Sequence, residues 1–325
     1  MSNPIEKIIE QFNLVILDGA MATEIEKKGV NIKNSLWSAK AVIDNPNSIK
    51  QVHADYFEAG ADIATTNTYQ ASIKGFVQEG WAKEEAENLI RATVALAKEA
   101  RDEFLENRVE LDNLNNKERP FPLVAGSVGP YGAYLANGAE YTGNYHLTEE
   151  EWKEFHLPRM QLMKEAGVDL FAFETIPNFE EGKVLADLLA AHFPNDYAWL
   201  SFSVADQGHI SDGTPLKEAV AYFNAYANIC GIGVNCTAAS HISAIIPILR
   251  EATSKPIVIY PNAGGTYDAE TKSWTSEQEE NHYGQQAKKW HNDGAKLIGG
   301  CCQTNPGHIN QIFKWARGFD TRCKS

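Results

Sequence analysis

Short, nearly continuous apolar runs recur along the chain, and eight of them stand out between residues 15 and 302. They are rich in β-branched and aliphatic residues, and most are bounded by Gly, Asn or Pro. Unbroken hydrophobicity, as opposed to strict alternation, is typical of parallel strands that are covered on both faces. The runs are VILDG (15–19), IATTNT (63–68), PLVAGSVG (122–129), LFAFETI (170–176), AWLSFSV (198–204), GIGVNC (231–236), IVIYPNAG (257–264) and KLIGGCC (296–302).

Helical patterns fill the intervals between these runs. Apolar residues recur there at helical spacing, and the ends carry residues that start or stop helices. The signals predict helices over 47–59, which precedes Gly60; over 83–106, with Ala86, Ile90, Val94 and Ala97 on one face; and over 148–166, which opens with Thr148 and Glu151 at capping-box spacing and ends at Gly167.

Eight alternations of strand and helix predict an α/β fold, a single (β/α)8 barrel of the TIM type that forms one domain over residues 1–325. The alternative is an open doubly wound sheet, but its usual GxGxxG turn after the first strand is missing. The segments 129–147 and 264–284 predict extended loops, and the polar stretch 108–119 predicts a surface loop. Long loops after barrel strands are where functional sites are built.

Composition narrows the function classes. The 325 residues are 43% hydrophobic, which suffices for a large core, and 29 basic against 43 acidic residues give a net charge of −14. This field repels a phosphate backbone, so we expect no nucleic-acid partner. Glu6 and Glu10 interrupt the N-terminal apolar residues and no window could span a bilayer, so we expect no membrane partner. Five cysteines, an odd number, favour a reducing, cytoplasmic location.

Polar or reactive residues follow several of the predicted strands. In a parallel barrel the carboxyl ends of all strands open onto one face, so these residues converge whatever their separation in sequence. They are Asp18 and Gly19 after the first strand, Asn67 in the second, Glu174 in the fourth, Cys236 in the sixth, Asn262 in the seventh, and Cys301 with Cys302 in the eighth.

Three of these residues are cysteines from two nearby strand ends, which indicates a zinc site with its fourth tetrahedral position open. Adjacent strand residues point to opposite faces, so Cys301 and Cys302 can share a metal only where the backbone departs from β geometry. Gly299 and Gly300 permit this departure. The alternative is that Cys236, Cys301 and Cys302 are ordinary packing residues, since no CxxC pair is present.

The chain resembles the homocysteine S-methyltransferase family over most of its length, from the first strand to about residue 312. Within that family it is most similar to the stand-alone enzymes that use S-methylmethionine, and the pairing of GVNC with GGCC is the most specific feature. The resemblance rests on LDGAMATEIEKKG (17–29), TTNTYQAS (65–72), GPYGAYLANGAEYTGNY (129–145), FETIPNFEE (173–181), GVNCTA (233–238), YPNAGGTYD (260–268) and GAKLIGGCCQTNPGHI (294–309).

The resemblance implies a metal centre. Cys236, Cys301 and Cys302 correspond to the family's three zinc ligands, so Zn2+ is the expected cofactor. Asn262 matches a position that, in some relatives, supplies an oxygen to zinc when homocysteine is absent. A free thiol such as that of the substrate, with a pKa of ~8.5, is mostly protonated at neutral pH, and coordination by zinc would deprotonate it into a nucleophile.

The resemblance also implies a substrate site in a homocysteine-binding barrel. Asp18, Gly19 and Ala20 match the turn that receives the homocysteine backbone, and Glu174 matches the carboxylate that holds its ammonium. Relatives that use betaine carry a tyrosine where this chain has Thr175. Two structural alternatives remain open: Glu174 in a structural ion pair, and Asp18 as the N-cap of the first helix.

The expected reaction is zinc-dependent transfer of a methyl group from S-methylmethionine, or another sulfonium donor, to L-homocysteine, forming methionine. A sulfonium donor loses its charge as the methyl moves, so no general acid is needed. The loop 129–147 contains four tyrosines, whose rings suit a cationic donor or serve ordinary loop packing. Alternatives are S-adenosylmethionine or betaine as donor, a metallohydrolase on the same barrel, and a zinc-storing barrel. The sequence leaves the oligomeric state open.

Overall fold

Eight parallel strands form one sheet in the computed structural model, which describes residues 3–30, 41–115, 119–264, 267–268, 273–274 and 282–318. The strand order is β1-β10-β7-β6-β5-β4-β3-β2, and a parallel bridge from Leu17 to Ile63 joins the two edges. The predicted barrel is therefore confirmed, and the open sheet is wrong. The strands are β1 Val15–Ile16, β2 Ile63–Thr65, β3 Leu123–Val128, β4 Leu170–Ile176, β5 Ala198–Phe202, β6 Ile229–Ala238, β7 Ile257–Asn262 and β10 Ala295–Ile298.

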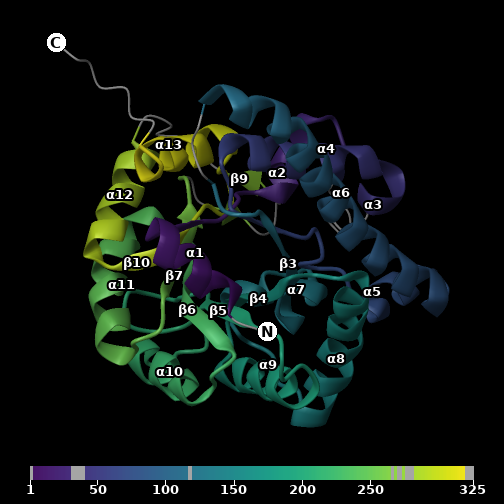
Figure 1. Cartoon of the computed structure of the whole chain (residues 1–325). Coiled ribbons are helices and arrows are strands. Elements are labelled where there is room, and N and C mark those ends of the chain that lie inside the picture. The colour runs from purple at the N-terminus through teal and green to yellow at the C-terminus, as the bar shows by residue number, and fades with distance from the viewer. Residues whose placement is uncertain are drawn as a thin grey trace.

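Helices surround the strands in a ring (Figure 1). They are α1 Pro4–Phe12, α2 Met21–Lys27, α3 Ala41–Asp44, α4 Pro46–Ala59, α5 Ile73–Gln78, α6 Lys83–Asn115, α7 Tyr131–Leu135, α8 Glu149–Ala166, α9 Phe179–His192, α10 Leu216–Tyr222, α11 Ala239–Ala252, α12 Tyr283–Asp293 and α13 Pro306–Ala316, with the 3-10 turns η2 Ala139–Tyr141 and η3 Phe223–Ala225.

The three helices predicted from the sequence are present. Gly60 ends α4 in the left-handed conformation, and Thr148 and Glu151 form the capping box of α8. Helix α6 is longer than predicted, because it continues to Asn115 through part of the expected surface loop 108–119. Residues 108–115 contain neither Gly nor Pro, so nothing in this polar segment interrupts the helix.

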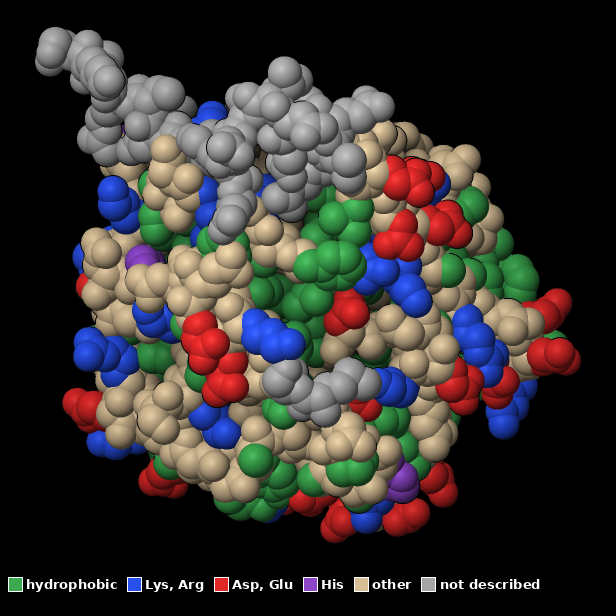
Figure 2. Space-filling model, in the orientation of Figure 1, with side chains coloured by type: hydrophobic (Ala, Val, Ile, Leu, Met, Phe, Trp, Pro, Cys, Tyr) green, Lys and Arg blue, Asp and Glu red, His purple; other side chains and the backbone are tan. Residues whose placement is uncertain are grey.

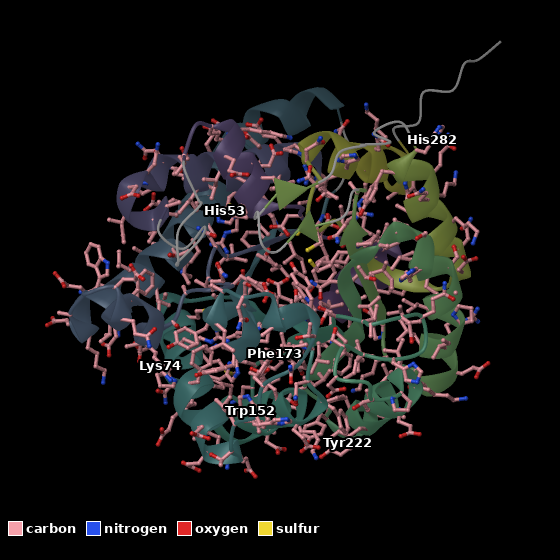
Figure 3. The ribbon with its side chains drawn as sticks, turned by 180° about the vertical axis from the view of Figure 1, so that it is seen from behind. His53, Lys74, Trp152, Phe173, Tyr222 and His282 are labelled. Carbon is pink, nitrogen blue, oxygen red and sulfur yellow. The ribbon has the colours of Figure 1, made fainter. Side chains whose placement is uncertain are left out.

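Alternate residues of each strand enter two separate cores. Phe171 and Phe173 of β4 pack outward with the helices, whereas Leu170 and Ala172 pack inside the barrel. Figure 3 shows the molecule from behind, where Phe173 of β4 lies nearer the centre than Trp152 of α8 and Tyr222 of α10, which lie on the ring of helices. Helix α1 inserts Ile5 into the interior core and closes the end where the strands begin, so the barrel opens only where the strands end.

The extended loop 129–147 carries α7 and η2 and is anchored to α9 by the buried carboxylate of Glu181. Its Oε1 accepts hydrogen bonds from the Tyr131 amide at 2.6 Å and, at 2.8 Å, from the ring of His156, and the Tyr145 hydroxyl donates to Oε2. This anchoring fixes the loop over the open end of the barrel.

The second extended loop, 264–284, contains a short antiparallel pair of strands, β8 Tyr267–Asp268 and β9 Ser273–Trp274, and α12 begins at its end. Residues 265–266, 269–272 and 275–281 of this predicted loop lie outside the described residues. Acidic and basic side chains are interspersed over the face seen in Figure 2. Within the described part of the chain, no helix is long and apolar enough to cross a membrane.

Candidate metal and substrate site

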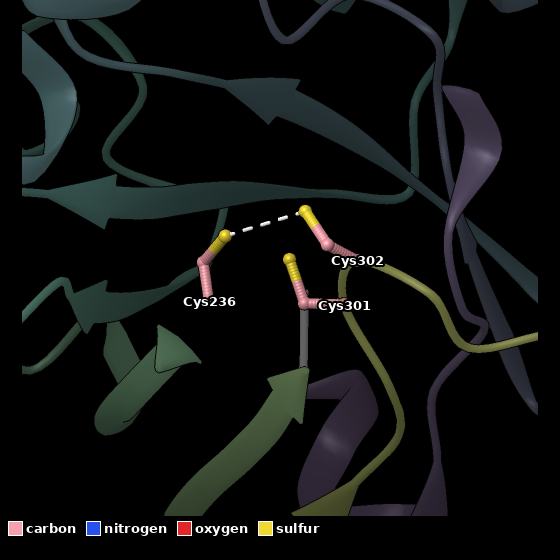
Figure 4. Close-up of side chains that lie close together, drawn as sticks. All are labelled: Cys236, Cys301 and Cys302. Atoms are coloured by element: carbon pink, nitrogen blue, oxygen red, sulfur yellow. Dashed lines mark hydrogen bonds between the residues drawn. The ribbon is translucent and has the colours of Figure 1, made fainter. Parts of the chain in front are cut away.

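Three cysteines meet at the open end of the barrel (Figure 4). Cys236 lies in an irregular stretch of β6 with φ of 51°, and β10 ends at Ile298, two glycines before Cys301 and Cys302. The three Sγ atoms lie within 4.8 Å of one another, and those of Cys236 and Cys302 are 3.6 Å apart. The departure from β geometry that the GGCC sequence requires is therefore present.

This donor set suits a soft metal ion. Among the described residues, no other group of three His, Cys, Asp or Glu side chains lies close enough to hold one. Hydrogen bonds from Cys301 and Cys302 hold the pKa of Cys236 below its ordinary value, and donating these bonds raises the pKa of Cys301 and of Cys302. By contrast, burial raises the pKa of Cys230 to about 12, and its thiol donates to a backbone carbonyl, as expected of a packing residue.

Asn262 lies beside the cluster at the end of β7. Its Oδ1 accepts a hydrogen bond from the Cys302 amide at 3.1 Å, and the Cys301 amide donates to the carbonyl of Pro261 at 2.8 Å. These bonds tie the cysteine turn to its neighbouring strand. In this structure the predicted conditional ligand positions the Cys302 backbone.

Asp18 follows β1 and is buried. Its Oδ2 accepts from the Thr65 amide at 2.7 Å, and the Thr65 hydroxyl lies 3.2 Å from both carboxylate oxygens. The N-cap of α2 is Ala20, so the alternative of Asp18 as a helix cap is wrong. Burial raises the pKa of Asp18 well above its ordinary value, and the nearby charge of Glu174 raises it further.

Glu174 points into the barrel from β4, because it continues the inward row of that strand. The hydroxyl of Ser127 donates to its Oε1 and that of Tyr260 to its Oε2, the latter at 3.1 Å. Neither partner is a Lys or Arg, so the structural ion-pair alternative is wrong. Burial raises the pKa of Glu174 to about 7.

The cysteines and both carboxylates line one pocket of about 120 Å3. Gly19 is required there because a Cβ at this position would lie 2.6 Å from the Thr304 hydroxyl oxygen. The same oxygen accepts a hydrogen bond from the Ala20 amide at 3.1 Å. Predicted residues that line the pocket are Asp18, Gly19, Ala20, Glu174, Cys236, Cys301 and Cys302, and Asn67 joins them.

Tyrosines enter the pocket from three elements. Of the four in loop 129–147, only Tyr141 lines the pocket, with its hydroxyl 3.6 Å from the Cys236 sulfur. The rings of Tyr131 and Tyr134 each contact Lys74 instead, as ordinary loop packing predicts. Tyr69, from the segment after β2, and Tyr260, of β7, also line the pocket. The sequence analysis did not identify either as a site residue, although they lie in TTNTYQAS and YPNAGGTYD.

Asn235 joins the two functional strand ends. Its Oδ1 accepts from the Thr175 amide at 2.7 Å, and its Nδ2 donates to the Thr175 hydroxyl at 2.8 Å. Thr175 has φ of 58°, a conformation that a β-branched residue rarely adopts, and the next residue after Asn235 is the similarly strained Cys236. The pair thereby fixes Glu174 relative to the cysteine cluster. In the sequence, only the motif GVNC pointed to Asn235.

The fold and this pocket define a (β/α)8 barrel with a cysteine cluster and two buried carboxylates at its functional end. Residues 15–316 match the model of the homocysteine S-methyltransferase family. The chain belongs to this family and is an enzyme of it, and methyl transfer to homocysteine is its supported activity.

Relatives match at nearly full length. The chain is 50% identical over 319 residues to homocysteine S-methyltransferase YbgG of Bacillus subtilis (strain 168), covering 98% of this chain and 99% of that protein. It is 44% identical over 311 residues to homocysteine S-methyltransferase of Escherichia coli (strain K12), covering 95% and 97%. The metallated form of the homocysteine methyltransferase MmuM from Escherichia coli superposes with a TM-score of 0.85 at 41% identity, covering 96% and 100%.

Proposed function

We propose that this enzyme transfers a methyl group from S-methylmethionine to L-homocysteine, with zinc held by Cys236, Cys301 and Cys302. The supporting observation is that three thiols within 4.8 Å of one another share a small pocket with Asp18 and Glu174. An amino acid that carries a thiol has groups that match both ends of this pocket.

The cluster fits zinc by the chemistry of its donors. Three thiolates form a common zinc set and leave one tetrahedral position for a substrate. Zinc bound there supplies the positive charge that keeps the homocysteine thiol ionised at neutral pH. Asn262 is the proposed oxygen ligand in the absence of substrate, and it would leave the Cys302 amide to do so.

The carboxylates bind the amino-acid end of homocysteine. Glu174 receives the ammonium, and Asp18 lies close enough that the charge of Glu174 raises its pKa. A bound ammonium favours the ionised form of Glu174, whose pKa of about 7 leaves it partly protonated in the free site. The turn at Gly19 brings the backbone within reach of the substrate carboxylate, although the Ala20 amide already donates to Thr304.

The transfer requires that the two sulfur atoms are oriented toward each other and that the site accommodates a positively charged donor. The homocysteine sulfur forms the new carbon–sulfur bond as the donor sulfur keeps the electron pair of the broken one, so two methionines result. Tyr69 and Tyr141 place aromatic rings near a cationic donor. Glu140 precedes Tyr141 in the sequence, and its buried carboxyl group lies close enough to affect the Tyr141 hydroxyl. Burial raises the pKa of Glu140 to about 7. The small pocket favours S-methylmethionine over a donor that carries adenosine.

The test is a donor comparison on the zinc-reconstituted enzyme with homocysteine present. Methionine formed from S-methylmethionine, S-adenosylmethionine and betaine is measured at equal concentrations, with a sample lacking homocysteine as the control. We expect S-methylmethionine to be fastest, S-adenosylmethionine slower, and betaine inactive because Thr175 stands where betaine users have tyrosine. A faster rate with either other donor would overturn the donor assignment. Donor breakdown without homocysteine would instead favour a hydrolase.

A further inference from the structure

We propose that Tyr260 is a positioning residue for homocysteine binding, which holds Glu174 ionised and aimed at the ammonium through a hydrogen-bonded chain that starts at Trp199. The proposal rests on the proposed role of Glu174. It adds residues of β5 and β7, deep in the barrel, to the machinery that selects an amino acid.

The chain of contacts crosses the barrel interior. Trp199 of β5 donates its indole N–H to the Tyr260 hydroxyl oxygen at 3.1 Å, and the Ser201 hydroxyl lies 2.5 Å from the same oxygen. Tyr260, from β7, then reaches Glu174 Oε2 at 3.1 Å. All four side chains are buried, so bulk water does not compete for these hydrogen bonds.

The hydrogens of this chain can be counted. An indole N–H can only donate, so Trp199 always fills one acceptor position of the Tyr260 oxygen. When Ser201 donates as well, the single phenolic proton of Tyr260 has Glu174 as its remaining partner. If Glu174 is protonated, Tyr260 can donate to Ser201 instead, and Ser201 can turn to the Phe173 carbonyl at 3.5 Å. When Glu174 is ionised, Trp199, Ser201 and Tyr260 can all donate in the direction of the pocket, and the chain ends on the carboxylate.

The surroundings of Glu174 make these donors necessary. The titratable groups that face it are Asp18 after β1, Tyr69 after β2, Cys236 of β6 and Tyr260 of β7. None of these side chains is a cation, and burial raises the pKa of Glu174 to about 7. The hydrogen bonds from Ser127 and Tyr260 act in the opposite direction and lower this pKa. Removing the Tyr260 donor therefore favours the neutral acid, which binds an ammonium poorly.

The experiment compares Tyr260→Phe with native enzyme at saturating donor and full metal loading. We expect the KM for homocysteine to rise about tenfold at pH 7, since a hydrogen bond to a charged group is lost. kcat should stay within about twofold and the metal content should be unchanged. The acid limb of kcat/KM for homocysteine should move to higher pH. Tyr226→Phe is the matched control, because it removes a tyrosine hydrogen bond to Asp187 on the outer surface and should leave KM and the pH profile unchanged.

A second variant covers the case in which Tyr260→Phe does not fold. Ser201→Ala leaves Tyr260 in place and removes the alternative acceptor of its proton, so the acid limb should move to lower pH and KM should not rise. An unchanged KM and acid limb in Tyr260→Phe overturns the proposal, and so does an acid limb that stays in place or moves to higher pH in Ser201→Ala. A fall in kcat alone, or a loss of metal, overturns it too, because positioning of the ammonium predicts neither.

Glu174→Gln separates this proposal from the function on which it rests. If Glu174→Gln raises KM but Tyr260→Phe does not, the carboxylate binds substrate and the positioning chain is wrong. If Glu174→Gln itself leaves KM unchanged, the proposed ammonium site is wrong, and the role of Tyr260 falls with it.

Discussion

Glu174→Gln should stabilise the protein at alkaline pH while it weakens homocysteine binding. In the folded protein the pKa of this carboxyl is raised from 4.5 to about 7, mainly by burial. The folded state therefore keeps a proton that the unfolded chain has released between these values. Glu174 therefore destabilises the folded state least below pH 4.5, and the free energy of unfolding falls as the pH rises from 4.5 through about 7.

The magnitude follows from the two pKa values. One pH unit of difference corresponds to about 1.4 kcal/mol, so charging Glu174 costs the folded state about 3 kcal/mol in total. About 2 kcal/mol of this falls between pH 5.5 and 8. Gln does not titrate and keeps the shape of the side chain, and the hydroxyls of Ser127 and Tyr260 can accept from its amide. The stability of Glu174→Gln relative to native enzyme should rise by that amount between the two pH values.

The assay is urea-induced unfolding of both proteins at pH 5.5 and pH 8, with equal metal loading. Glu180→Gln is the control, since Glu180 is exposed and paired only with Lys183 on the surface. Its stability difference from native enzyme should change little with pH. A Glu174→Gln variant whose stability difference is the same at both pH values, or that is less stable at pH 8, would refute the reasoning. Homocysteine affinity should meanwhile fall by about 2–5 kcal/mol.

Three further predictions concern the metal centre and the scaffold. Cys301→Ser should lose most of its bound metal in elemental analysis, whereas Cys230→Ser should retain it, and full occupancy in Cys301→Ser would exclude the cluster as the site. Arg317→Met leaves the buried Asp62 without its cation, so thermal or urea unfolding should show a loss of about 3–5 kcal/mol, and an unchanged midpoint would contradict this. Gly233→Ala places a Cβ 1.8 Å from the carbonyl oxygen of Val258, so β6 and β7 must separate. We expect little soluble protein from it, and native-like unfolding would show that the strands can move apart.

The sequence by itself determined the barrel and much of the site. Unbroken apolar runs marked all eight barrel strands, since a parallel strand is buried on both faces and its pattern is local. The fold then made residues at strand ends converge, which brought Cys236 and Cys301 together despite their separation in sequence. The glycines before Cys301 indicated the turn that lets adjacent cysteines point the same way. Local chemistry and a known topology sufficed for these inferences.

Local pattern did not decide the contacts that depend on register between strands. Asp18 resembled a helix cap, yet it binds the backbone of Thr65 on a neighbouring strand. For Glu174, a structural ion pair was an open alternative to substrate binding, yet its partners are hydroxyls. The link from Trp199 to Glu174 runs through Tyr260. It exists because β4, β5 and β7 point these three side chains into the same barrel interior. Which inward residues meet at one level is set by the tilt and stagger of the whole barrel, so only the tertiary structure could decide it.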